Sequence, residues 1–172
     1  GDARDVSSPD GLAHLHRMRA LVDAVIIGVR TALHDSPQLT VRQCVGPNPT
    51  RVVIDPRGRL GDDASVFRDD GVRRVVIQVA DVDRPPGVEV ITLPTHQGRV
   101  RPLDIVTALG ERGLTSLLVE GGSFTLSRFI EAGLLNRLHI AVAPVIIGGG
   151  PQGLTMPHPV EHLADALRPP TN

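Results

Sequence analysis

The sequence predicts an α/β fold with a mostly parallel central sheet and helices on both of its faces. Short runs rich in Val, Ile and Leu alternate with stretches of helical periodicity, a pattern typical of parallel sheets with crossover helices. Apolar residues make up 41% of the chain, yet it has no Trp, no Tyr and only three Phe, so aliphatic side chains must build the core. Such strands are typical of a sheet buried on both faces. The 172 residues suffice for one domain with its own core.

The expected elements begin with a helix. Ser8 is a typical N-cap residue and Pro9 is typical of the first turn, so the two predict a helix over roughly residues 9–21. Short apolar runs bounded by Gly, Pro, Asp or Asn then predict strands at residues 24–27, 51–54, 73–79, 88–93, 116–119 and 138–143.

Two further helices are expected between these strands. The first begins at Pro102, and its apolar stripe is formed by Leu103, Ile105, Val106 and Leu109. The second follows Gly122 and ends near Gly133, where a left-handed residue would close it. In a sheet of this kind, ligands are expected beyond the carboxyl ends of the strands.

The junction after residues 116–119 predicts an anion site. Gly121 and Gly122 follow the strand directly, and glycine lets the backbone approach a ligand closely. The unpaired N–H groups of the next helical turn, together with the positive end of the helix dipole, attract phosphate. Ser123 is the expected N-cap. An ordinary tight connection between strand and helix also favours glycine, so both interpretations stay open on these residues alone.

Polar side chains gather where the strand at residues 24–27 ends. Thr31 and Asp35 can form hydrogen bonds with ribose or amide groups. Arg42 offers the forked, permanently charged donor that suits a phosphate, and Arg19 on the preceding helix could join it. The alternatives are a turn-forming aspartate and solvated surface arginines.

Composition and charge argue against several classes of protein. The formal net charge is −1 and aromatic residues are scarce, which argues against nucleic acid as a partner. The single cysteine, Cys44, cannot form an internal disulfide, and no Cys/His group has zinc-site spacing. Neither a long apolar run nor a signal peptide is found, so we expect a cytoplasmic protein with no membrane contact.

Three motifs follow one another along the chain: Gly28-x-x-Thr31-x-x-x-Asp35-x-Pro37-x-Leu39-Thr40-Val41-Arg42, Val119-Glu120-Gly121-Gly122 and residues 143–150. In this order they resemble the pyrimidine reductase of riboflavin biosynthesis, the C-terminal reductase domain of the bifunctional deaminase-reductase family, over nearly the whole chain. The resemblance implies a dihydrofolate-reductase-like fold and a homodimer. It also implies that NADPH reduces the ribosylamino group of a phosphorylated pyrimidine to ribitylamino.

The resemblance also implies two sets of site residues. NADPH would be held by Thr31, Asp35, Gly121, Gly122, Ser123, Phe124, Thr125, Leu126, Ser127 and Arg128. The substrate would be held by Arg19, Leu39, Arg42 and Glu120, with the arginines near its phosphate. No metal is expected.

Three further assignments follow from placement within that framework. Arg57 and Arg59 could hold the 2′-phosphate of NADPH, with solvated loop arginines as the alternative. Gly148, Gly149 and Gly150 could approach the nicotinamide, or form a turn. His34 is a candidate acid because an ordinary histidine titrates near neutrality, the alternative being an exposed loop residue. No catalytic side chain is assigned.

The chain departs from the family pattern in three ways. It begins after the family's first strand and ends before its last pair of strands, so we expect further segments at both ends. It shows no zinc deaminase motif and is expected to be a stand-alone reductase. Two alternatives remain: a different NADPH-dependent reductase of the same fold with a pterin-like substrate, and a non-catalytic nucleotide-binding relative.

Overall fold

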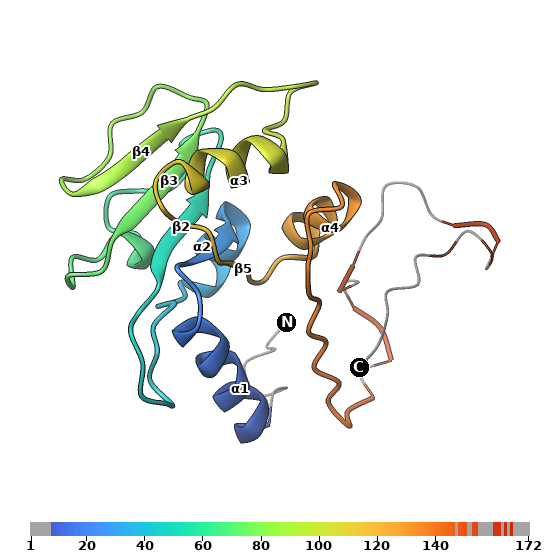
Figure 1. Cartoon of the computed structure of the whole chain (residues 1–172). Coiled ribbons are helices and arrows are strands. Elements are labelled where there is room, and N and C mark those ends of the chain that lie inside the picture. Colours follow the sequence, from blue (N-terminus) through green and yellow to red (C-terminus); the bar gives the residue numbers. More distant parts are fainter. Residues whose placement is uncertain are drawn as a thin grey trace.

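A five-stranded, all-parallel sheet forms the centre of the protein in a computed structural model, with the strand order β4-β3-β2-β1-β5 (Figure 1). The structure describes residues 8–146, 148–150, 153–154, 160–162, 164 and 166. The strands are β1 (Ala24–Gly28), β2 (Thr50–Ile54), β3 (Arg74–Gln78), β4 (Val88–Thr92) and β5 (Leu117–Val119). The helices are α1 (Pro9–Ala20), α2 (Val29–Asp35), α3 (Pro102–Gly110) and α4 (Ser123–Glu131), with a short 3₁₀ helix, η1 (Ser65–Phe67).

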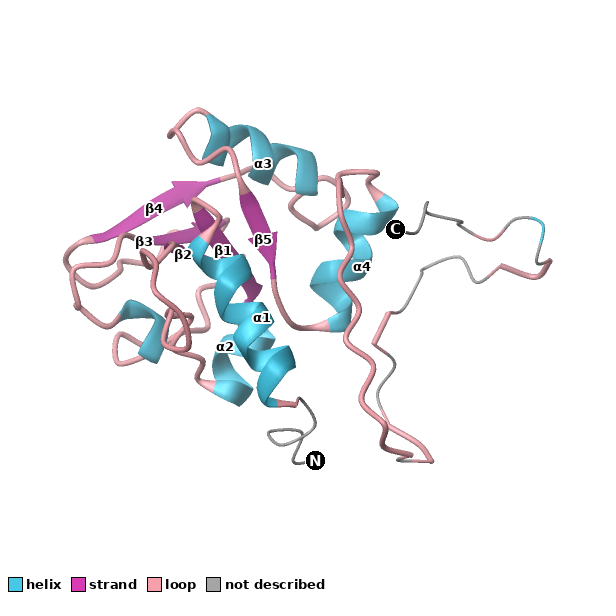
Figure 2. Cartoon of the chain, turned by 60° about the horizontal axis from the view of Figure 1, so that its bottom comes forward, coloured by secondary structure: helices cyan, strands magenta, loops and turns pink. Residues whose placement is uncertain are grey.

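Two apolar clusters cover the two faces of the sheet. Along β1, Ala24 and Ile26 belong to one cluster and Val25 and Ile27 to the other, as the two-residue period of a strand requires. The first cluster includes side chains of α3 and α4, and the second includes side chains of α2. Figure 2 shows α3 on one side of the sheet and α2 on the other. The predicted α/β fold with helices on both faces is therefore confirmed.

The position of β1 brings three chain segments to one edge of the sheet. β1 pairs with β2 on one side and with β5 on the other, in a register that sets Gly28 opposite Ile54 and Ile26 opposite Val119. All three strands run in the same direction, so their carboxyl ends lie together. The start of α2, the loop after β2 and the glycines before α4 consequently meet at this edge.

Most of the predicted elements are confirmed. The first helix is capped by the Ser8 hydroxyl, which accepts a hydrogen bond of 3.1 Å from the Gly11 amide. The first five predicted strands are present, each within one residue of its expected ends. The departures expected at the two ends of the chain fall outside the described residues.

Two predictions about the elements are wrong, and one helix was not predicted. Residues 138–143 form no strand, because no neighbouring strand pairs with their backbone in the described part of the chain, and Ile140 and Val142 are 70% and 87% exposed. Leu103 is 54% exposed, since the face of α3 that packs on the sheet is formed by Pro102, Ile105, Ala108 and Leu109. Residues 29–35 form the helix α2, which the sequence analysis did not expect.

Candidate functional site

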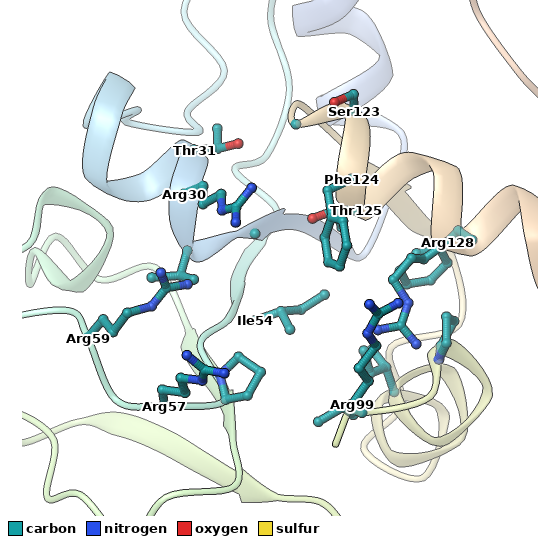
Figure 3. A pocket seen from close by; sticks show the side chains of 18 of the residues that line it. Arg30, Thr31, Ile54, Arg57, Arg59, Arg99, Ser123, Phe124, Thr125 and Arg128 are labelled. Atoms are coloured by element: carbon teal, nitrogen blue, oxygen red, sulfur yellow. The ribbon is translucent and has the colours of Figure 1, made fainter. Parts of the chain in front are cut away.

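A pocket of about 340 Å³ opens at the carboxyl edge of the sheet (Figure 3). Its walls are the start of α2, the loop after β2, the segment before α3 and the first turns of α4. Its lining consists of Gly28, Val29, Arg30, Thr31, Ile54, Pro56, Arg57, Arg59, Gly98, Arg99, Val100, Pro102, Ile105, Gly122, Ser123, Phe124, Thr125, Arg128 and Phe129. We call this the arginine pocket, because five of these residues are arginines and none, among the residues that the structure describes, is acidic.

The glycines before α4 leave no room for side chains. Gly121 and Gly122 have φ angles of 64° and 69°, a region that L residues with side chains rarely adopt. A Cβ atom on Gly122 would lie 3.0 Å from Thr31 Oγ1, and a Cβ atom on Gly28 would collide with Thr125 Oγ1. The two strand-to-helix junctions therefore pack closely against each other, and Ser123, Phe124 and Thr125 of the first turn of α4 line the pocket.

The predicted N-cap of α4 is wrong by one residue. Gly122 is the N-cap, and Ser123 is the first helical residue. The first intrahelical hydrogen bonds run from the amides of Thr125 and Leu126 to the Gly122 carbonyl, at 3.0 and 3.2 Å. The amides of Ser123 and Phe124 precede these bonds and lie in the turn that normally offers its N–H groups to an anion.

Three guanidinium groups gather around one aromatic ring of the arginine pocket. The guanidinium carbons of Arg30, Arg99 and Arg128 lie 5.9, 5.7 and 5.9 Å from the centre of the Phe124 ring. Burial, and then repulsion by Arg99, hold the pKa of Arg128 below its usual range. A ligand that carries several negative charges would relieve this repulsion, which favours phosphate groups over a neutral ligand.

A second group of residues, the Arg19–Glu120 cluster, lies where α1 and β5 end. It consists of Arg19, Leu39, Arg42 and Glu120. Arg19 Nε and Nη2 donate to the two Glu120 carboxylate oxygens at 2.7 and 2.6 Å, and Arg19 Nη1 donates to the Thr40 carbonyl at 3.0 Å. The two charged side chains are only 8% and 12% exposed. In this structure all three nitrogens of the Arg19 guanidinium are therefore engaged by protein groups.

Leu39 and Arg42 flank Thr40 and complete the cluster. Leu39 is buried with a φ of 55°, so the chain turns sharply there. Arg42 Nη1 donates to Gln38 Oε1 and Thr40 Oγ1 at 2.9 and 2.8 Å, while its side chain stays exposed. This arrangement orients an accessible cation beside the buried ion pair.

His16 shapes the backbone of the same segment. Its Nδ1 atom accepts a hydrogen bond of 2.9 Å from the Arg42 amide, which requires the unprotonated nitrogen. Burial, and then the charges of Arg19 and Arg42, lower the pKa of His16. The sequence analysis did not single out this histidine, since nothing in the spacing of His16 relates it to Arg42.

The residues predicted for the cofactor, together with the candidate acid His34, fall into two groups according to whether they line the arginine pocket. Those that line the arginine pocket are Thr31, Gly122, Ser123, Phe124, Thr125 and Arg128, together with Arg57 and Arg59. Those that do not line it are Asp35, Gly121, Leu126, Ser127, the candidate acid His34 and the glycines at 148–150. Asp35 and His34 are exposed near the end of α2, whereas Ser127 is buried on the inner side of α4.

Arg30 and Arg99 are pocket residues that the sequence analysis missed. Arg30 stands two residues after the glycine that ends β1, in a stretch already marked as polar, so its position was an available signal. Arg99 lies in the connection from β4 to α3, and no local pattern links that connection to the carboxyl edge of β1.

Comparison with known proteins gives one consistent family. Residues 1–166 match the family model described as the RibD C-terminal domain. The riboflavin biosynthesis protein RibD of Actinobacillus pleuropneumoniae is 31% identical over 156 residues, covering 87% of this chain and 42% of that protein. The 2,5-diamino-6-ribosylamino-4(3H)-pyrimidinone 5′-phosphate reductase of Methanothermobacter thermautotrophicus is 30% identical over 175 residues, covering 95% of this chain and 79% of that protein.

Solved structures agree with this result. A diaminohydroxyphosphoribosylaminopyrimidine deaminase/5-amino-6-(5-phosphoribosylamino)uracil reductase from Thermotoga maritima is 34% identical, with a TM-score of 0.68 over 77% of this chain and 36% of that one. RibD of Acinetobacter baumannii shares the fold, with 24% identity and a TM-score of 0.73 over 97% of this chain and 47% of that one. This chain thus spans less than half the length of these two RibD proteins and of the Thermotoga maritima protein.

Proposed function

We propose that this chain, which belongs to the RibD C-terminal domain family, is an NADPH-dependent reductase of riboflavin biosynthesis. It reduces the ribosylamino group of a phosphorylated pyrimidine to ribitylamino. The observation that carries this proposal is the arginine pocket, where five arginines meet a glycine junction at the start of a helix and no acidic residue is found among the described lining residues.

The arginine pocket fits a dinucleotide phosphate. The glycine junction would hold the diphosphate on the amides of Ser123 and Phe124, where a Cβ atom on Gly122 would intrude. Arg57 and Arg59 lie on the other side of the pocket from Arg99 and Arg128 (Figure 3) and would hold the 2′-phosphate. When bound, reduced nicotinamide supplies the hydride.

The Arg19–Glu120 cluster would bind the second reactant. Arg42 offers its exposed guanidinium to the substrate phosphate, and the Arg19–Glu120 ion pair holds a carboxylate in a fixed orientation toward polar groups of the substrate. Glu120 immediately precedes the two glycines of the cofactor pocket. The same strand end therefore places both reactants, and the contribution of the protein is mainly their proximity. A homodimer and a cytoplasmic location, which the resemblance implies, belong to the same proposal.

The test is NADPH oxidation by the purified chain, followed by the loss of nicotinamide absorbance. The substrates are a pterin and the two pyrimidine phosphates that appear in the names of its relatives, a diaminopyrimidinone and an aminouracil that each carry a phosphorylated ribosylamino group. Turnover of one of the two pyrimidine phosphates supports the proposal. Turnover of a pterin alone would favour a different reductase, and NADPH binding without oxidation of either pyrimidine would favour the non-catalytic alternative.

A further inference from the structure

The loop at residues 55–60 carries two of the five arginines of the pocket. Arg57 and Arg59 are both exposed, and Arg59 is 45% exposed along its side chain. Long exposed side chains on a surface loop lose rotational freedom when they bind a ligand. The contribution of Arg57 and Arg59 to ligand binding therefore depends on whether the backbone of the loop is fixed in position.

The buried side chain of Asp55 connects the two ends of this loop. The side chain is fully buried, and Oδ2 accepts a hydrogen bond of 2.9 Å from the Leu60 amide at the other end of the loop. Its other oxygen, Oδ1, is buried without a hydrogen-bond partner and lies 3.9 Å from Arg59 Nε. A buried carboxylate in this setting is costly unless cations compensate it, so the charge of Asp55 requires a partner.

Arg84 supplies that partner from the connection between β3 and β4. Its side chain is 1% exposed, and it does not line the pocket. Nη2 donates to Asp55 Oδ2 and Nη1 to the Leu60 carbonyl, both at 3.0 Å, so one guanidinium grips both ends of the loop.

The guanidinium of Arg84 is itself fixed in place. Its Nε donates to Gln78 Oε1 at 2.8 Å, and Gln78 Nε2 donates to the Val82 carbonyl at 2.9 Å. The guanidinium carbon of Arg84 also lies 5.6 Å from the centre of the Phe67 ring. The loop at 55–60 is thus tied to β3 through a rigid, buried network rather than through the ligand pocket.

We propose that Arg84 is a positioning residue for recognition of the 2′-phosphate. It acts through Asp55 and Leu60, and it holds the loop so that Arg57 and Arg59 face the pocket. This inference rests on the proposed function, since it concerns the same dinucleotide. It predicts that Arg84 affects the preference for NADPH over NADH, although it touches neither.

The test compares dissociation constants of NADPH and NADH for the wild-type chain and for Arg84→Lys, measured by nicotinamide fluorescence. The chain has no Trp and no Tyr, so little protein fluorescence interferes. Lysine keeps the charge but cannot form the forked contacts to both ends of the loop. We expect the preference for NADPH to fall about tenfold, with NADH affinity changed by less than about twofold.

Arg51→Lys is the matched control. Arg51 is also 1% exposed and also holds a loop, through the Arg68 carbonyl and Asp70, but that loop does not line the pocket. This variant should keep the wild-type preference. Thermal unfolding of both variants shows whether each one folds. If Arg84→Lys does not fold, Gln78→Leu decides, because it removes the acceptor of Arg84 Nε and should lower the preference about threefold.

The outcomes separate the inference from the proposed function. Equal weakening of both dinucleotides, an unchanged preference in the deciding variant, or the same loss of preference in Arg51→Lys would overturn the inference alone. A wild-type chain that binds neither dinucleotide would overturn both.

Discussion

The arginine pocket and the Arg19–Glu120 cluster both depend on arginine, but they neutralise its charge differently. In the cluster, a buried carboxylate of the same chain meets Arg19 in two hydrogen bonds. In the arginine pocket, no acidic residue is found among the described lining residues. Burial, and then repulsion by Arg99, lower the pKa of Arg128. The protein itself supplies the counter-charge where a side chain must be held rigid. In the arginine pocket, where we propose that a phosphate binds, Glu131 offsets only part of the effect on Arg128, and the ligand would supply the remaining counter-charge.

The largest expected effect comes from breaking the buried pair with Glu120→Gln. This change leaves the Arg19 cation buried without its carboxylate, and it should lower the free energy of unfolding by about 3 kcal/mol. It should also abolish most pyrimidine reduction, while the NADPH dissociation constant stays near its wild-type value. Urea denaturation, a turnover assay and nicotinamide fluorescence measure the three quantities.

Asp104→Asn is the control for Glu120→Gln. It removes the carboxylate of the Arg101–Asp104 pair, where Arg101 is 51% exposed and solvent screens the interaction. Stability and activity should change little. If Glu120→Gln weakened NADPH binding as strongly as it lowers turnover, the two regions would not be separate, and the comparison would fail.

The second effect concerns the backbone of the pocket. Gly122→Val places a branched side chain at a φ of 69° and against Thr31, where it would crowd the dinucleotide diphosphate. NADPH should bind at least about tenfold more weakly, which corresponds to about 1.4 kcal/mol. Fluorescence titration measures the change.

The chain provides a close control for that substitution. Gly133, just after α4, has a φ of 66°, but nothing lies within 4 Å of a Cβ atom built there. Gly133→Val therefore carries similar backbone strain without filling the pocket. Wild-type NADPH affinity in Gly122→Val, or an equal loss in both variants, would contradict the assignment of the diphosphate to this junction.

The elements that build the arginine pocket were not equally predictable from the sequence. Strand periodicity predicted β1 to β5, and the glycine pair before α4 predicted an anion site, which remains a prediction, at a junction whose Gly122 lines the pocket. Residues 29–35 had no such signal, because Val29 and Thr31 are β-branched and the segment is only seven residues long. Its helical form depends on packing against the sheet rather than on intrinsic preference.

Long-range contacts account for the rest of the differences. Ser123 and Gly122 are both acceptable N-caps, and the positive φ of Gly122 together with the close approach of Thr31 favours glycine at the cap position. The pairing of Arg19 with Glu120 joins residues 101 positions apart, and the grip of Arg84 on Asp55 joins residues 29 apart. Neither separation matches the period of a helix or strand, so these partners become apparent only when the topology is known.

The smallest expected effect is the loss of NADPH affinity when one arginine of the pocket, Arg99, is replaced. Arg99 is exposed, so solvent screens it, and Arg99→Gln should weaken NADPH binding by only about fivefold, or about 1 kcal/mol. The difference from wild type should shrink as salt is added, because screening weakens the attraction between a guanidinium and a phosphate. Titrations at low and high ionic strength measure both effects.

Arg17→Gln separates this local effect from a change in net charge. Arg17 is exposed on α1 and does not line the pocket, so its removal lowers the net charge by the same amount without removing a pocket cation. Its NADPH affinity should match wild type at every ionic strength. An equal loss in Arg17→Gln would mean that the overall field of the protein attracts the dinucleotide, and that the arginines around Phe124 have no special role.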